Sequence, residues 1–229
     1  MTAIGAERVS RPMWRQALGL ATAALTYFLL ARGSLYFASL NASATPVWAP
    51  TGLAIALLLV RGPSMLPAIF VAAFAANFQT TPSLATAGLI AVGNSLEAYV
   101  AYVLLRSWAD GERLFYSPLG IAKFSVVVVV AAAPISAFIG VTALAATGYA
   151  RWRDYAPVWT TWWLGDLAGA ILATPALVLW ARTLRGEERR EISSQTAVAL
   201  VSAVLVGLLA FTPLSPIPAS MRGALGSGT

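Results

Sequence analysis

Long, largely apolar segments constrain this chain more than any other feature. The stretches 14–40, 83–106, 120–147 and 156–181 each exceed the ~18 residues that mark a membrane-spanning helix. Hydrophobic residues make up 59% of the chain and charged residues only 10%, whereas soluble domains carry about 25% charged residues. Backbone groups in lipid must be paired within the protein, which favours helices. We therefore predict an all-α, polytopic transmembrane helical bundle.

The apolar pattern predicts about seven crossings, and an eighth crossing would return the C-terminal tail to the inner side. Their expected bounds are 14–40, 48–60, 65–78, 83–106, 120–147, 156–181 and 196–211. We expect residues 1–13 to form a cytoplasmic N-terminal segment, 14–211 the membrane domain and 212–229 a flexible tail. We interpret the first apolar run as an uncleaved helix rather than a signal peptide.

Two of these segments are short and contain helix-breaking residues. Pro50 and Gly52 lie at the start of the second segment, which predicts a broken or late-starting helix. Residues 61–64 predict a tight turn, so the second and third segments form either a plain helical hairpin or broken helices lining a cavity. In the fifth segment, Pro134 predicts a kink.

Basic residues predict the orientation in the membrane. With the N-terminus inside, 11 of the 15 Lys and Arg residues lie on the inner side and 4 on the outer side. The four on the outer side are Arg32, Arg151, Arg153 and Arg222. This bias predicts a cytoplasmic N-terminus in a bacterial inner membrane. The net charge of +6 therefore reflects topology, and we expect no nucleic-acid partner.

The chain contains no cysteine and no histidine. Their absence excludes disulfides, iron–sulfur clusters, zinc held by cysteine or histidine, and a histidine acid–base catalyst. No glycine loop suited to a phosphate is present either. Gly165 and Gly169 lie four residues apart in an apolar segment, a spacing that predicts close helix packing. We expect no catalytic residues, no enzymatic activity, no cofactor and no metal.

Two carboxylates fall near the middle of apolar segments. Asp166 lies at the centre of 160–169, and Glu97 follows Asn94 by three residues, on the same helical face. A charge at such depth costs ~2.5–3.5 kcal/mol and almost always faces protein or water. The simplest interpretation of Arg32 is a side chain that extends to the membrane surface, and the alternative is a counter-ion for one of these carboxylates. The carboxylates could be structural anchors or part of a site that senses a ligand or a proton.

We expect a ligand or signal pocket to form around these carboxylates. Two tryptophans lie within about a turn of Asp166, and aromatic faces beside a carboxylate suit a cationic or amphipathic small ligand. The candidate pocket residues are Trp48, Pro50, Thr51, Gly52, Asn77, Asn94, Glu97, Trp162, Trp163 and Asp166.

Several motifs in order resemble the first type of the membrane-associated sensor family, abbreviated MASE. They are Val47–Leu53, Pro67–Phe70 leading to Asn77, Gly93–Ala98, Ile139–Val141, Trp162–Gly169 and Thr174–Pro175. The resemblance covers roughly residues 14–211. It implies a bacterial integral membrane sensor domain of about eight helices, fused to a cytoplasmic histidine kinase, diguanylate cyclase or phosphodiesterase. Against this pattern, we expect the chain to be an incomplete eight-helix domain that is shortened at its C-terminal end and lacks an output module.

The resemblance therefore predicts a sensory, signal-input domain in two-component or cyclic-di-GMP signalling. Its expected partners are the lipid bilayer, an unknown small ligand and a histidine kinase or diguanylate cyclase output module. A small transporter or permease fragment is the alternative, because broken helices and buried carboxylates also suit ion-coupled transport. The third reading is a membrane anchor that senses nothing.

Overall fold

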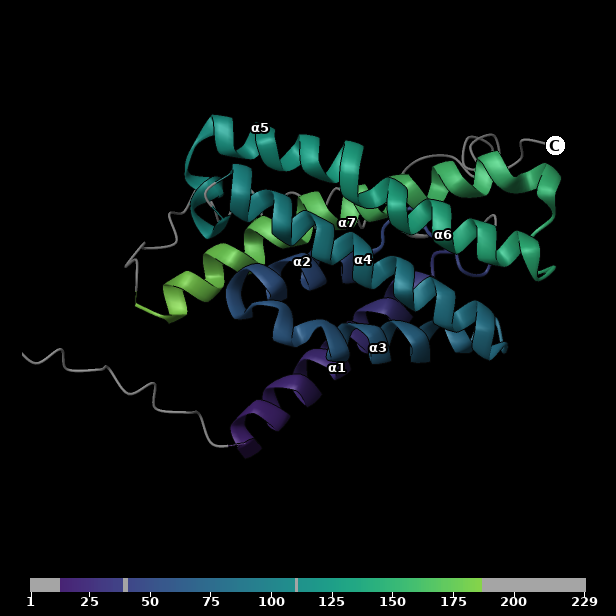
Figure 1. Cartoon of the computed structure of the whole chain (residues 1–229), viewed down its shortest axis with the longest axis horizontal. Helices are drawn as coiled ribbons and strands as arrows, with labels where there is room; N and C mark the ends of the chain where they lie inside the picture. The colour runs from purple at the N-terminus through teal and green to yellow at the C-terminus, as the bar shows by residue number, and fades with distance from the viewer. Residues whose placement is uncertain (1–12, 39–40, 110, 187–229) are drawn as a thin grey trace, which may run out of the picture. The chain divides into compact units, whose positions relative to one another are not determined.

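The computed structural model describes residues 13–38, 41–109 and 111–186. Within these ranges every regular element is helical and no strand forms, which confirms the all-α prediction (Figure 1). Two units divide the chain, Met1–Ala181 and Arg182–Thr229, and all the helices except the end of α7 belong to the first. The expected seventh crossing, 196–211, the tail, 212–229, and nearly all of the segment 1–13 lie outside the described residues.

The helix bounds follow the apolar segments closely. The α-helices are α1 (Met13–Leu35), α2 (Ala49–Arg61), α3 (Leu66–Phe78), α4 (Leu84–Trp108), α5 (Pro118–Val126), α6 (Ala133–Ala146) and α7 (Tyr155–Leu184). The shorter elements are η1 (Pro63–Met65), η2 (Gly111–Tyr116), the π-helical η3 (Val127–Ala132) and η4 (Trp152–Asp154).

Four helical stretches are long and apolar enough to cross a membrane. They are Met13–Leu35, Leu84–Trp108, Pro118–Ala146 and Trp152–Leu184. The helices α2 and α3 are apolar but have only 13 residues each. At 1.5 Å per residue each is ~20 Å long, which is shorter than a hydrocarbon core of ~30 Å. The chain is thus an integral membrane protein, but the described residues do not establish seven crossings.

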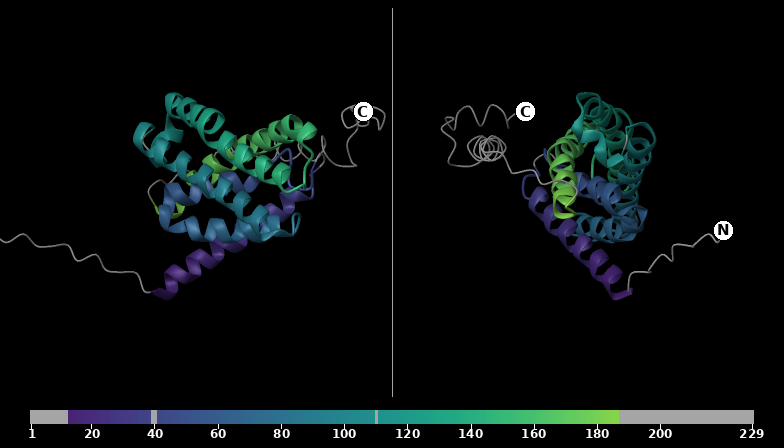
Figure 2. Two further views of the ribbon diagram at one scale, coloured as in Figure 1. Left: turned by 45° about the vertical axis from the view of Figure 1, so that its right-hand side comes forward. Right: turned by 90° about the vertical axis from the view of Figure 1, so that its left-hand side faces the viewer.

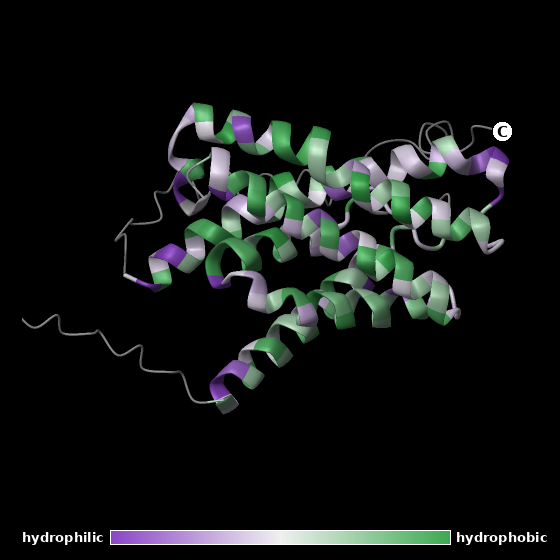
Figure 3. Cartoon of the chain, in the orientation of Figure 1, coloured by the Kyte–Doolittle hydropathy of each residue, from purple (hydrophilic) through white to green (hydrophobic). Residues whose placement is uncertain are grey.

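The helices pack with α4 at the centre. It contacts α2, α3 and α6, while α1 packs against α2 and α3. Both views in Figure 2 place α1 on the side of α2 and α3, away from α5 and α6. Most hydrophilic residues lie toward helix ends in Figure 3, as expected for a bundle surrounded by lipid.

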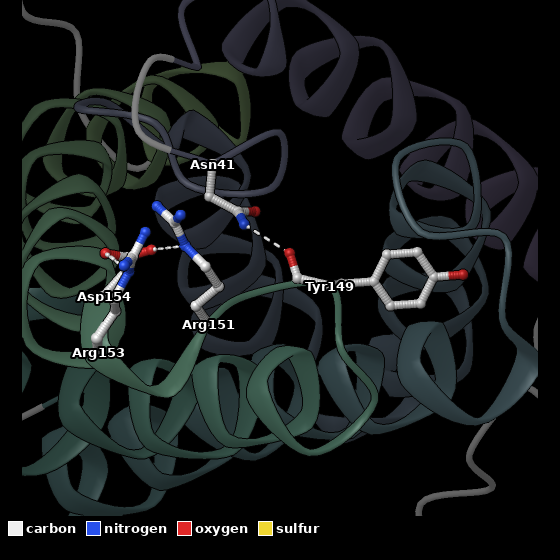
Figure 4. A network of polar contacts seen from close by, with 5 residues as sticks. All are labelled: Asn41, Tyr149, Arg151, Arg153 and Asp154. Atoms are coloured by element: carbon white, nitrogen blue, oxygen red, sulfur yellow. Dashed lines mark hydrogen bonds and ion pairs between the residues drawn. The ribbon is translucent and has the colours of Figure 1, made fainter.

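Contacts between chain segments define two ends of this bundle. At the "Tyr149 end", Asn41 Nδ2 donates to Tyr149 O over 3.1 Å, beside the ion pair between Arg151 and Asp154 (Figure 4). At the "Arg61 end", Arg15 and Arg61 line one cavity and η2 contacts α2, α4 and α5. The described basic residues of the first unit lie at both ends. Those at the Arg61 end are Arg15, Arg61, Arg106, Arg113 and Lys123, and those at the Tyr149 end are Arg32, Arg151 and Arg153.

An irregular segment, 41–48, folds into the bundle before α2 begins. Ser43, Ala44 and Thr45 are buried, and the backbone N–H of Trp48 donates to Gly165 O over 2.9 Å. Irregular backbone at membrane depth is tolerated only where protein or water covers it. The late start predicted for this helix is therefore present, with Pro50 in its first turn, where a missing N–H costs nothing.

Glycines on α7 allow this segment to approach closely. A Cβ at Gly165 would overlap the carbonyl oxygen of Thr45, and one at Gly169 would overlap that of Trp48. Gly52 contributes from the other side, because its Cβ would overlap Gly169 O. The glycines thus allow α7 to pack against both the irregular segment and the first turn of α2.

The hydrogen-bond pattern of the helix changes just before Pro134. In η3 the bonding runs five residues back, with the N–H of Ala133 donating to Val128 O. The next acceptor in that register is Val129 O, and Pro134 has no N–H to give it. Trp163 Nε1 donates to Val129 O over 3.0 Å instead. A π-helical turn thus precedes Pro134, and a tryptophan of α7 satisfies the carbonyl that Pro134 cannot bind.

We expect Gly169→Ala to destabilise the protein by about 1–3 kcal/mol, because the added methyl must push Trp48 away from α7. Thermal unfolding in detergent micelles measures the effect. Gly88→Ala in α4 is the control, since nothing lies within 4 Å of its added Cβ. Alanine has a higher helix propensity than glycine, so the unfolding temperature of this control should be no lower than that of the wild type. Equal unfolding temperatures for the two variants would contradict the close approach.

Candidate functional site

One hydroxyl group joins three helices at the middle of the bundle. Thr51 Oγ1, in the first turn of α2, lies 2.9 Å from Asp166 Oδ1 of α7 and 3.2 Å from Glu97 Oε2 of α4. All three residues are buried, with Glu97 1% and Asp166 0% exposed. Glu97 and Asp166 each lie more than ten residues from the nearest end of their helix. We call Thr51, Glu97 and Asp166 the carboxyl cluster.

One oxygen of each carboxyl group in this cluster has no hydrogen-bond partner among the described residues. These atoms are Glu97 Oε1 and Asp166 Oδ2, and both are buried. An unsatisfied buried polar group costs ~1–3 kcal/mol, and more when it is charged. The carboxyl cluster therefore has unused capacity to bind a positively charged or hydrogen-bonding group.

Asn94 organises a second set of polar contacts one turn before Glu97 on α4. Its Oδ1 accepts from Trp48 Nε1 over 3.1 Å and from Tyr27 OH over 3.3 Å. Its Nδ2 donates to Ile90 O over 2.9 Å. Asn94 thereby connects α1, the irregular segment and α4 directly beside the carboxyl cluster.

The two tryptophans before Asp166 point to different places. Trp162 is buried and close to Asp166, and its Nε1 donates to Ser136 Oγ over 3.1 Å. Trp163 instead binds Val129 O and stacks on Trp159, with ring centroids 5.7 Å apart. Only Trp162 therefore forms part of the surroundings of Asp166.

The other sequence candidates divide in the same way. Pro50 and Gly52 are buried beside Thr51 in the first turn of α2. Asn77 is buried too, but its Nδ2 donates to Ala73 O of its own helix over 2.9 Å. Arg32 is exposed near the end of α1, and the described residues give neither carboxylate an ion pair. The structure thus brings together Trp48, Pro50, Thr51, Gly52, Asn94, Glu97, Trp162 and Asp166.

Two residues of this site were not predicted from the sequence. Tyr27 of α1 is fully buried, and Ser136 of α6 lies close to both carboxyl groups. Each is a polar side chain within an apolar helix, and such residues usually face other helices. That signal is present in the sequence but is shared by many serines and tyrosines near membrane surfaces.

Three cavities lie elsewhere. Two of them, of about 520 and 610 Å³, share Arg15, Arg61 and Met65 between α1 and α2. The third, of about 410 Å³, is an apolar groove between α3 and α4 that includes Phe70 and Tyr99. None of the ten candidate pocket residues lines these three cavities.

A comparison with protein families identifies the chain. A family model described as MASE1 matches residues 19–225. The chain belongs to the MASE1 family. The resemblance carried by the sequence motifs is thereby confirmed, and the chain is a membrane sensory domain of a family that is not catalytic. No curated protein and no solved structure matches it.

We expect Asn94→Leu to lower the free energy of unfolding by about 1–3 kcal/mol or more, because it leaves the Trp48 and Tyr27 donors buried without an acceptor. Asn77→Leu makes the same change at a buried amide to which no described side chain donates. It should therefore cost less. Thermal unfolding of both variants tests this, and equal losses would mean that Asn94 is not the shared acceptor.

Proposed function

We propose that this MASE1 domain is the signal-input part of a bacterial signalling system in the inner membrane. Its signal acts at the carboxyl cluster and the adjoining Trp48, Asn94 and Trp162. The output module would be a histidine kinase or diguanylate cyclase, as the family resemblance implies. The observation that carries the proposal is the single hydroxyl of Thr51 between Glu97 and Asp166, because it joins three helices through two short contacts.

These contacts suit a sensor because they determine how helices pack. In lipid there is little hydrophobic force between helices, so packing and interhelical hydrogen bonds decide their positions. A signal that binds differently to two arrangements shifts the balance between them. Occupation or loss of a contact at the carboxyl cluster would move α4 relative to α2 and α7.

We propose that the Arg61 end faces the cytoplasm. Five of the described basic residues of the first unit lie there, and three lie at the Tyr149 end. Basic residues favour the cytoplasmic side of a membrane. The N-terminus of α1, which carries Arg15, would then be cytoplasmic.

Transport is the second candidate function. The buried carboxylates and the irregular segment before α2 resemble the discontinuous helices around which transporters build ion sites. Many transporters are built from internal repeats, and the sequence shows none. Measured flux through the protein would distinguish the two functions.

Single cysteines test the orientation without background, because the chain has none of its own. We expect Ala146→Cys, exposed at the Tyr149 end, to react with a membrane-impermeant maleimide in intact spheroplasts. Ser107→Cys, exposed at the Arg61 end, should react only after the membrane is permeabilised. Both changes keep every basic residue. The opposite labelling pattern would reverse the proposed orientation.

A diguanylate cyclase domain fused to the protein at the Arg61 end, which is proposed to be cytoplasmic, reports on signalling. We expect Glu97→Gln and Asp166→Asn to change cellular cyclic di-GMP several-fold relative to the wild-type fusion, because the first alters the contact of Thr51 with α4 and the second its contact with α7. The exposed Asp154→Asn is the matched control and should leave the output unchanged.

The outcome against this proposal is also measurable. If all three variants give wild-type output at equal protein levels, the carboxyl cluster does not control signalling. If the purified protein carries an ion or solute across proteoliposomes and Glu97→Gln abolishes that flux, transport is the better description.

A further inference from the structure

With both carboxyl groups ionised, the carboxyl cluster would have fewer hydrogens than its two short contacts require. A threonine hydroxyl has one hydrogen and can donate it to one acceptor at a time. Thr51 Oγ1 nevertheless lies within hydrogen-bond distance of two carboxyl oxygens, at 2.9 and 3.2 Å. If Glu97 and Asp166 were both ionised, one of these contacts would place two oxygens together without a hydrogen between them.

Among the described residues of the first unit, no buried positive charge compensates the pair. None of the described Arg or Lys residues up to Ala181 is buried. The groups facing the two carboxyls from other elements are Tyr27 of α1, Thr51 of α2 and Ser136 of α6, and α7 adds Trp162. Tyr27 is the titratable one among these four, and it cannot supply a positive charge. Two carboxylates that both lie within hydrogen-bond distance of one hydroxyl would repel strongly in a medium of low dielectric constant.

We propose that Glu97 and Asp166 bind one proton between them and that Thr51 bridges the pair. The Thr51 hydroxyl donates to the Asp166 carboxylate, which is the shorter contact. Protonated Glu97 then donates from Oε2 to Thr51 Oγ1, so each contact contains one hydrogen. The proton comes from water and returns to it, with no other reactant.

Loss of this proton has a structural consequence. Two facing carboxylates would repel, and the contact between Glu97 and Thr51 would have no hydrogen. The first turn of α2 is held against α7 by the Trp48 N–H bond to Gly165 and by the contact of Gly52 with Gly169. The Thr51 contact with α4 is therefore the one that would open, moving α4 away from α2 and α7.

This proposal does not depend on signalling. A bound proton at the carboxyl cluster would exist whether or not the domain drives an output module. If it does, the proton is the ligand whose binding changes helix packing, and the proposed signal is pH or a ligand that displaces the proton.

Infrared difference spectroscopy of the full chain in lipid nanodiscs tests the proposal directly. We expect the C=O stretch of a buried, protonated carboxylic acid at neutral pH, and its loss as the pH is raised. Glu97→Gln should remove this band, while the control Asp154→Asn keeps it. Thr51→Val is nearly isosteric and should shift the band to higher frequency, because the acid loses its acceptor. Thr51→Ser should restore the wild-type position.

Three results would overturn the inference. The first is the absence of a protonated-acid band in the wild type at neutral pH. The second is an unchanged band in Thr51→Val, which needs no change to either carboxyl and so tests the bridge even if Glu97→Gln fails to fold. The third is loss of the band on addition of sodium or potassium chloride at constant pH, which would make this a metal-cation site instead.

Discussion

The close approach of the irregular segment to α7 is the constraint on which the rest of the structure depends. Residues 45 to 48 are not helical, and the Trp48 N–H finds its acceptor on α7 and not within its own segment, so lipid cannot cover this backbone. Gly165 and Gly169 remove the side chains that would hold it away, and Gly165 O accepts the Trp48 N–H. The start of α2 is thereby fixed at the middle of the bundle. Only from that position can Thr51 contact α4 and α7 at the same time.

Much of the fold could be predicted because membrane helices are recognisable by length and hydropathy alone. The expected segment 83–106 agrees with α4 (Leu84–Trp108) and 48–60 agrees with α2 (Ala49–Arg61), including its late start at Pro50. The crossing count was harder, since a helix of 13 residues satisfies the apolar pattern without the length to span the bilayer. The π-helical turn before Pro134 was predicted only as a kink, because the sequence does not specify how the register adapts.

The candidate site was partly predictable for a different reason. Glu97 and Asp166 stand out because charge is rare in apolar segments, and the structure buries both. Which neighbours each one meets depends on helix rotation and on long-range packing, neither of which the spacing along one helix determines. Trp162 and Trp163 illustrate this, since adjacent residues on α7 point to Ser136 and to Val129 O respectively. Tyr27 was missed because a single tyrosine within an apolar segment does not indicate which acceptor on another helix its hydroxyl meets.

If the carboxyl cluster is the sensing site, as proposed, the response would depend on the small number of its polar contacts. Apolar side chains in lipid lose little when helices separate, since lipid tails replace the neighbouring helix. The position of α4 is therefore decided to a large extent by the few polar atoms that meet near its middle. Asn94 binds Trp48 and Tyr27, and Glu97 binds Thr51, so two residues on one face of α4 hold it to three other segments. In the protonation proposed above, loss of the hydrogen at Glu97 would remove one of these three contacts and leave the Asn94 contacts in place. The expected motion is then a pivot of α4 about Asn94 rather than an opening of the whole bundle.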